Sequence, residues 1–157
     1  MRINYARIAR TIAAVAMVTG LATAVVHTQP AQASTSYGNA ALNWAEAHGA
    51  GHWYGWGGTG PAVFDCSGLV YASMLHTNPH WPSSVRTTYA MIAWLYAHAR
   101  VVPVSQAQRG DLLFFGSGHV EFATIWHHTS FGAQQTGTRV WWHSWSGWWA
   151  PTMAFRV

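Results

Sequence analysis

Phe64-Asp65-Cys66-Ser67-Gly68-Leu69-Val70 is the stretch that decides how this chain folds, and it holds the only cysteine among 157 residues. Cys66 follows a glycine-rich loop and opens an apolar run that predicts a helix. Free N–H groups and the positive dipole end at a helix N-terminus favour a thiolate and can stabilise an oxyanion. Asp65 is the expected helix cap, and Ser67 and Gly68 keep the first turn small. These features favour a nucleophilic Cys66.

The alternative is an inert thiol, because free cysteine is among the most buried residue types. A structural cysteine would more naturally lie in the middle of a helix, on its apolar face. The position of Cys66 at a loop-to-helix junction therefore favours the reactive interpretation.

The pattern of apolar residues changes along the chain. Helices are predicted at residues 37–48, 66–76 and from Ser83 or Ser84 to 100, with an irregular glycine-rich stretch at 49–61. Short β-branched or aromatic runs predict antiparallel strands at 101–104, 111–115, 119–125, 130–133, 139–145 and 152–157. Helices first and strands second give an α+β fold in one domain.

A thiolate nucleophile needs a base, and His119 is the best placed of the ten histidines. It opens a predicted strand directly after the small residues Gly116-Ser117-Gly118. A lone histidine in a strand is more often structural. The preceding block Gly110-Asp111-Leu112-Leu113-Phe114-Phe115 is what singles this one out.

Five blocks resemble the NlpC-type cell-wall peptidases in order and approximate spacing, and the resemblance covers nearly all of the predicted domain, from about Trp44 to Val140. These peptidases are papain-like cysteine hydrolases, so the resemblance implies N-terminal helices packed on a C-terminal antiparallel sheet. The blocks are Tyr54-Gly55-Trp56-Gly57-Gly58, Phe64-Asp65-Cys66-Ser67-Gly68-Leu69-Val70, Arg86-Thr87, Gly110-Asp111-Leu112-Leu113-Phe114-Phe115 and Gly118-His119-Val120.

The resemblance also implies the roles of catalytic residues. Cys66 would be the nucleophile and His119 the base, with a third polar residue on the following strand orienting the imidazole. The family usually has a histidine there, about a dozen residues beyond the base. In this chain that region points to Gln134, whose carbonyl can accept the imidazole N–H. Gln135 and His143 remain alternatives, because a shift of one residue along a strand reverses the facing.

Substrate contacts are implied in the same way. Tyr54 is expected close to the nucleophile, and Asp65 and Ser67 are expected to bind the free amino terminus of a stem peptide. The predicted function is a peptidoglycan hydrolase that cleaves a stem-peptide amide, between D-glutamate and the diamino acid. Alternatives are an N-acetylmuramoyl-L-alanine amidase, a transacylase, and a wall-binding domain without turnover.

Residues 1–33 are predicted to be a secretory signal peptide. Arg2, Arg7 and Arg10 precede an uncharged apolar run, and Ala31-Gln32-Ala33 supplies a cleavage pattern. The domain would then be residues 34–157, secreted to the cell wall or medium as a monomer. No membrane contact is expected after cleavage.

The composition of the predicted domain argues against several other classes. Five arginines face four acidic residues and there is no lysine, so no nucleic-acid footprint is expected. The pairs His48 with His52 and His127 with His128 lack the spacing of a metal site, so neither metal nor cofactor is expected. Five tryptophans near the C-terminus are predicted as core and rim rather than as a sugar platform: Trp141, Trp142, Trp145, Trp148 and Trp149.

Overall fold

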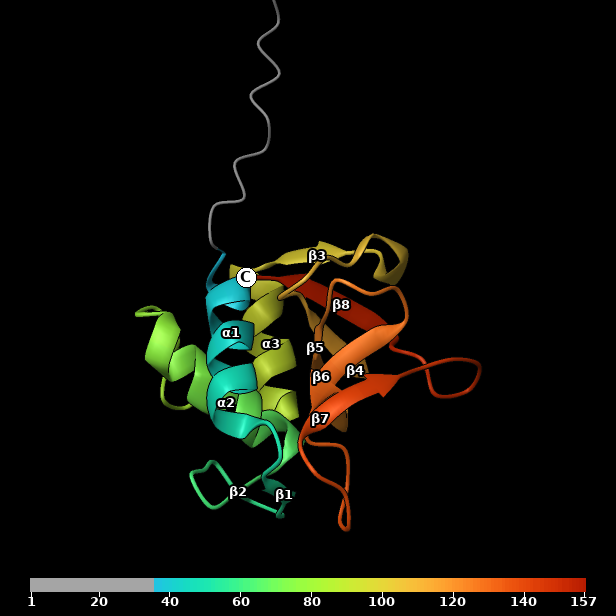
Figure 1. The fold of residues 1–157 in the computed structure, drawn as a ribbon. Helices are drawn as coiled ribbons and strands as arrows, with labels where there is room; N and C mark the ends of the chain where they lie inside the picture. The colour runs from blue at the N-terminus through green and yellow to red at the C-terminus, as the bar shows by residue number, and fades with distance from the viewer. Residues whose placement is uncertain (1–35) are drawn as a thin grey trace, which may run out of the picture. The chain divides into compact units, whose positions relative to one another are not determined.

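The computed structural model describes residues 36–157, so the predicted signal peptide at 1–33 lies outside the described residues. Within this range, helices α1 (Tyr37–Gly49), α2 (Cys66–Thr77) and α3 (Thr88–His98) lie beside a six-stranded sheet (Figure 1). Helices precede the sheet along the chain, which confirms the α+β class. No helix in this range is both long and apolar enough to cross a membrane.

The sheet is antiparallel, with strand order β3-β8-β4-β5-β6-β7. In this order β5 has β4 on one side and β6 on the other. The strands are β3 (Arg100–Val102), β4 (Leu112–Phe115), β5 (His119–Ala123), β6 (Thr129–Gly132), β7 (Trp141–Ser144) and β8 (Met153–Arg156). A short 3₁₀ helix, η1 (Val104–Gln106), follows β3.

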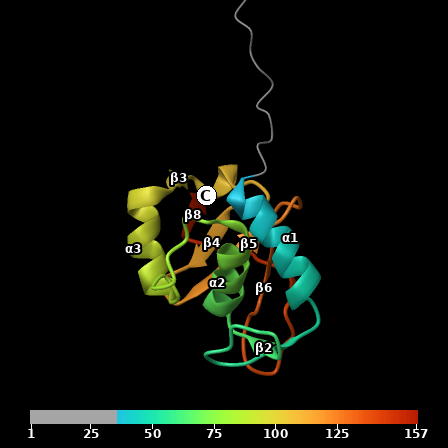
Figure 2. The ribbon, with the colours of Figure 1, turned by 90° about the vertical axis from the view of Figure 1, so that its left-hand side faces the viewer.

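Helix α2 is the central helix of the fold, between α1 and α3 and in front of the sheet (Figure 2). Asp65 caps it, as predicted, by accepting the Gly68 N–H at 2.6 Å. Leu69, Val70 and Met74 are fully buried. An apolar helix of this kind is stable only when surrounded by protein, which explains its central place.

Alternation along the central strands divides their side chains into two rows. Leu112 and Phe114 on β4 join the main core with the helices. Leu113 and Phe115 point the other way, into a smaller apolar cluster. His119 pairs with Phe115 and Glu121 with Leu113 across β4 and β5, so both polar residues belong to this second row.

Two local predictions were wrong. The third helix begins at Thr88 with Thr87 as its cap, rather than at Ser83 or Ser84. The preceding residues form a turn, because the Val85 N–H bonds to the carbonyl of Pro82. The stretch at 49–61, predicted to be irregular, contains β1 (Trp53–Tyr54), which pairs in parallel with β2 (Val63–Phe64).

Candidate active site

The thiol of Cys66 lies at the first residue of α2, where the N–H groups of the opening turn have no carbonyl partner within the helix. The loop before α2 packs closely on this turn. A Cβ atom at Gly68 would lie 1.9 Å from the Gly58 carbonyl oxygen, so only glycine fits there. The Gly58 oxygen also accepts the Asp65 N–H at 2.9 Å. The loop therefore fixes the helix end that carries the thiol.

Asp65 is the polar centre of this junction and is 7% exposed. Its carboxylate accepts the Gly57 N–H at 2.8 Å and the Gly68 N–H at 2.6 Å. Arg86 donates to the same carboxylate at 2.9 Å and to the Ser67 hydroxyl at 2.8 Å. The predicted substrate residues Asp65 and Ser67 thus share one arginine, whose Arg86-Thr87 block was already visible in the sequence.

On the other side of the thiol, β5 presents His119. Its Nε2 lies 2.9 Å from Oε1 of Glu121, two residues along the same strand. The second carboxylate oxygen of Glu121 accepts the Ser130 hydroxyl at 2.5 Å. Glu121 is fully buried. With Nε2 engaged, Nδ1 is the nitrogen left for the thiol.

The surroundings of His119 favour the charged form of its imidazole. Burial lowers the pKa of the imidazole, but hydrogen bonds and charge from Cys66 and Glu121 outweigh it and raise the pKa from 6.5 to about 9. The imidazole is therefore protonated at neutral pH and lies between a thiol and a carboxylate. This arrangement favours a thiolate–imidazolium pair.

Two aromatic rings border the imidazole. The Trp149 ring centroid lies 5.4 Å from that of His119, and the Phe115 centroid 5.5 Å. Trp149 and Phe115 stack on each other at 4.9 Å. They exclude water from the His119–Glu121 pair, which strengthens its electrostatic interaction.

A cleft of about 420 Å³ opens beside Cys66. Tyr54, Asp65, Ser67 and Arg86 contribute to its lining. Burial and the negative charges of Cys66 and Asp65 raise the pKa of Tyr54, so its hydroxyl keeps its proton next to the thiol. The structure therefore brings the three predicted substrate residues to one cleft with the predicted nucleophile.

None of the three residues predicted to orient His119 forms a hydrogen bond with it among the described residues. Gln134 follows β6, is half-buried, and makes no side-chain hydrogen bond to His119 in the part of the chain that the structure describes. Gln135 is exposed, and His143 has its Nε2 3.2 Å from the Gly132 carbonyl oxygen. The role of Gln134 stays a prediction. Sequence reasoning missed Glu121, although residues i and i+2 of a strand share a face.

Comparison with known proteins identifies the family of this chain. A model of the NlpC/P60 family matches residues 51–150 of this chain. The chain belongs to the NlpC/P60 family. The resemblance seen in the sequence blocks is thereby confirmed.

Relatives of this NlpC/P60 domain share part of its length. A probable endopeptidase p60 of Listeria seeligeri is 44% identical over 68 residues, covering 41% of this chain and 11% of that protein. The corresponding protein of Listeria innocua is 40% identical over 65 residues, covering 41% and 12%. The chain thus spans a small fraction of these relatives.

Solved structures share the fold. The NlpC/p60 domain of the peptidoglycan hydrolase SagA matches with a TM-score of 0.60 and 30% identity, over 76% of this chain and 98% of that chain. The peptidoglycan hydrolase RipB of Mycobacterium tuberculosis matches with a TM-score of 0.59 and 24% identity, over 76% and 64%. The papain-like α+β fold is confirmed.

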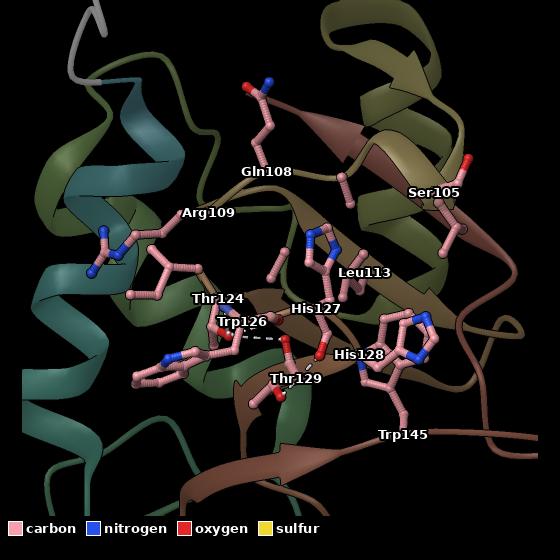
Figure 3. Close-up of a pocket in the computed structure, with 14 residues that line it drawn as sticks. Ser105, Gln108, Arg109, Leu113, Thr124, Trp126, His127, His128, Thr129 and Trp145 are labelled. Carbon is pink, nitrogen blue, oxygen red and sulfur yellow. Dashed lines mark hydrogen bonds between the residues drawn. The ribbon is translucent and has the colours of Figure 1, made fainter.

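A second hollow, of about 500 Å³, lies at the opposite end of β5 from His119 in this NlpC/P60 domain (Figure 3). Trp126, His127 and His128 line it from the loop after β5. Trp145, also in its lining, has a buried Nε1 without a hydrogen-bond partner among the described residues. This hollow is separated from Cys66 by the length of the strand.

The other histidines and tryptophans pack in several ways. His48 and His76 both stack on Trp44, each with its ring centroid 4.5 Å from that of the indole. Within residues 36–157, no three His, Cys, Asp or Glu side chains converge as metal ligands. Of the five C-terminal tryptophans, Trp141 and Trp148 are exposed, and Trp142, Trp145 and Trp149 pack against the two apolar clusters.

Proposed function

We propose that this NlpC/P60 domain is a secreted peptidoglycan hydrolase that cleaves a stem-peptide amide, between D-glutamate and the diamino acid. The observation that carries the proposal is Cys66 at the N-terminus of α2 beside a protonated His119. The p60 and SagA relatives, described as an endopeptidase and a peptidoglycan hydrolase, support the same activity.

The chemistry follows from these two groups. The Cys66 thiolate attacks the amide carbonyl and forms a C–S bond, while free N–H groups of the first turn of α2 stabilise the oxyanion. The C–N bond then breaks, and the imidazolium of His119 gives its proton to the leaving amine. Water, deprotonated by His119, hydrolyses the thioester and releases a carboxylic acid and the free thiol.

The cleft supports recognition of a short peptide with a free amino terminus. An ammonium group entering the cleft meets the carboxylate of Asp65 and the hydroxyl groups of Ser67 and Tyr54. Arg86 holds the first two in place. Because Cys66 lies beside these groups, the bond that is cleaved is close to the amino terminus that they bind.

Secretion rests on the sequence of residues 1–33. Expression of the full chain with its own N-terminus should release a protein into the medium that begins near Ser34. Recovery of the unprocessed chain from the cells alone would contradict secretion.

Digestion of purified peptidoglycan tests the activity. The secreted domain and its Cys66→Ser variant are incubated with sacculi, and also with stem peptides that an amidase has released from sacculi and that carry the free amino terminus bound by the cleft. The soluble fragments are analysed by mass spectrometry. Fragments ending at D-glutamate, absent with Cys66→Ser, are the expected result. Release of intact stem peptides would indicate the amidase instead.

Two further outcomes decide between the remaining classes. If neither protein releases fragments from several wall types but the domain sediments with sacculi, the domain is a binding domain. Formation of new amide bonds to an added amine, in preference to hydrolysis, would indicate a transacylase.

A further inference from the structure

Strand β6 leaves a gap in its row of side chains where it passes Glu121. Phe131 pairs with Phe122 and Ser130 with Ala123, so Gly132 is the next residue of β6 beside Glu121. A Cβ atom at Gly132 would lie 2.5 Å from Cγ and 2.8 Å from the carboxyl carbon of Glu121. The side chain of Glu121 therefore occupies space that any other residue at 132 would fill.

We propose that Glu121 is the positioning residue of His119, taking from β5 the part that the resemblance assigns to a residue on the following strand. Its Oε1 accepts the imidazole Nε2–H at 2.9 Å. That bond fixes the ring so that Nδ1 faces Cys66. Gly132 makes this change of position possible. Because β6 has no side chain at residue 132, the carboxylate of Glu121 on β5 can occupy that space.

Because the carboxylate of Glu121 is buried, its orientation is determined by the few groups that donate hydrogen bonds to it. Glu121 is fully buried, and each of its oxygens has one donor, His119 on one and Ser130 on the other. A buried carboxylate without such partners would be strongly unfavourable. The Ser130 hydroxyl thus holds the second oxygen and sets the rotation of the carboxylate towards the imidazole.

The surroundings leave Glu121 and the thiol as the charges that act on His119. Cys66 reaches it from α2, and Asp65 beyond it is paired with Arg86. Phe115 from β4 and Trp149 from the loop before β8 are uncharged. His143 on β7 has its Nε2 directed to the Gly132 carbonyl. The proton affinity of His119 is therefore a direct measure of the role of Glu121.

The inference rests on the proposed Cys66–His119 mechanism, so its test needs a readout that does not require turnover. Cys66 is the only cysteine, and alkylation of the protein by iodoacetate therefore reports on that thiol alone. Iodoacetate is an anion and is attracted by the imidazolium. Its reaction rate should fall as His119 loses its proton, near pH 9 in the wild type.

The decisive variant is Glu121→Gln, which keeps the shape and removes the charge. We expect the alkaline fall of the alkylation rate to move from about 9 towards the ordinary histidine value of 6.5. On peptidoglycan, kcat should fall about 100-fold or more, a loss typical of a general base out of position, with a small change in KM. An alkaline fall that stays at the wild-type pH overturns the proposal.

Glu121→Asp is the conservative partner of this variant, since it keeps the charge and withdraws it by one methylene. It should place the alkaline fall between those of the wild type and Glu121→Gln. A merely structural glutamate would give the same profile in both variants. If Glu121→Gln does not fold by circular dichroism, the Asp variant decides alone, and a wild-type profile there overturns the proposal.

Gln134→Ala is the matched test of the rival residue. We expect its alkylation profile to remain that of the wild type. A shift with Gln134→Ala and none with the Glu121 variants would return the role to Gln134. Inactivity of the wild type on every wall, with the alkylation profiles as expected, would contradict the hydrolase and leave the positioning role of Glu121 standing.

Discussion

Two buried carboxylates flank the Cys66–His119 pair, and their surroundings differ. Asp65, on the cysteine side, is held by backbone N–H groups and by the guanidinium of Arg86. Glu121, on the histidine side, is held by the Ser130 hydroxyl and by an imidazole. A guanidinium keeps its charge at any accessible pH, whereas an imidazole does not. Asp65 therefore keeps a charged partner at every accessible pH, whereas the partner of Glu121 is charged only while His119 holds its proton.

The two carboxylates therefore have different roles, one in positioning the thiol and the other in the protonation of the histidine. Asp65 joins the glycine loop, the N-terminus of α2 and Arg86, so its bonds determine where the thiol lies. Glu121 bonds to the proposed base itself, so its charge influences whether that base is protonated. Changes on the Asp65 side should act mainly on stability and binding, and changes on the Glu121 side on pH dependence and turnover.

The largest effect is expected from His119→Gln, which removes the base and leaves the charge of Glu121 buried without its cation. Turnover on peptidoglycan should fall at least about 1,000-fold, since no other group can accept or return the proton. Fragment release followed over time measures this loss. Retention of more than a tenth of the wild-type rate would contradict the role of His119.

A smaller effect is expected from pH. Because folding raises the pKa of His119 from 6.5 to about 9, the stabilisation is fully present below 6.5 and is lost as pH rises through about 9. The expected loss is about 3 kcal/mol of unfolding free energy. Urea unfolding at a series of pH values measures it, with His119→Gln as the control in which this decline should be largely absent. An equal decline in the two proteins would assign it to other groups.

Next in size is Arg86→Gln, which leaves Asp65 with neutral donors. We expect a loss of about 1–3 kcal/mol of unfolding free energy, because a buried carboxylate loses a charged hydrogen-bond partner. The alkaline limb of iodoacetate alkylation should stay in place. Arg100→Gln is the matched control, since Arg100 is exposed. Equal stability of both variants would show that the Asp65 cluster is dispensable.

The smallest effect is expected from Trp148→Ala. Its side chain is 94% exposed, so the unfolding free energy should change by no more than about 0.5 kcal/mol. Trp149→Ala provides the contrast, since that ring stacks on Phe115 beside His119. If Trp148→Ala lowers the unfolding free energy as much as Trp149→Ala does, the Trp148 side chain makes stabilising contacts despite its exposure, and the prediction is wrong.

Much of the site could be predicted from the sequence, because local chemistry determines it. Asp65 caps α2, the neighbouring glycines allow the loop to approach, and His119 opens a strand, as the motifs indicated. Glu121 could not be assigned, because its partner Ser130 and the space at Gly132 come from another strand. The register between β5 and β6 is a tertiary property that spacing does not reveal.

The boundaries of elements were harder to predict for a similar reason. Ser83, Ser84 and Thr87 are all good helix caps by composition. The Trp81 indole bonds to the Val85 carbonyl at 3.2 Å and holds the intervening residues in a turn, which leaves Thr87 as the cap. A buried tryptophan several residues away thus determined where α3 begins.

The loop at 49–61 and strand β5 also differ in how readily they open. Strand β5 is hydrogen-bonded on both sides, so its amides should be among the last to exchange with solvent. The loop is rich in glycine and several of its amides bond over short turns, such as Gly58 N–H to the Gly55 carbonyl, so they should exchange before those of β5. Gentle warming should therefore loosen the support that Gly58 gives to the helix end carrying the sulfur, while the strand that carries the base stays intact, and cooling should restore that support.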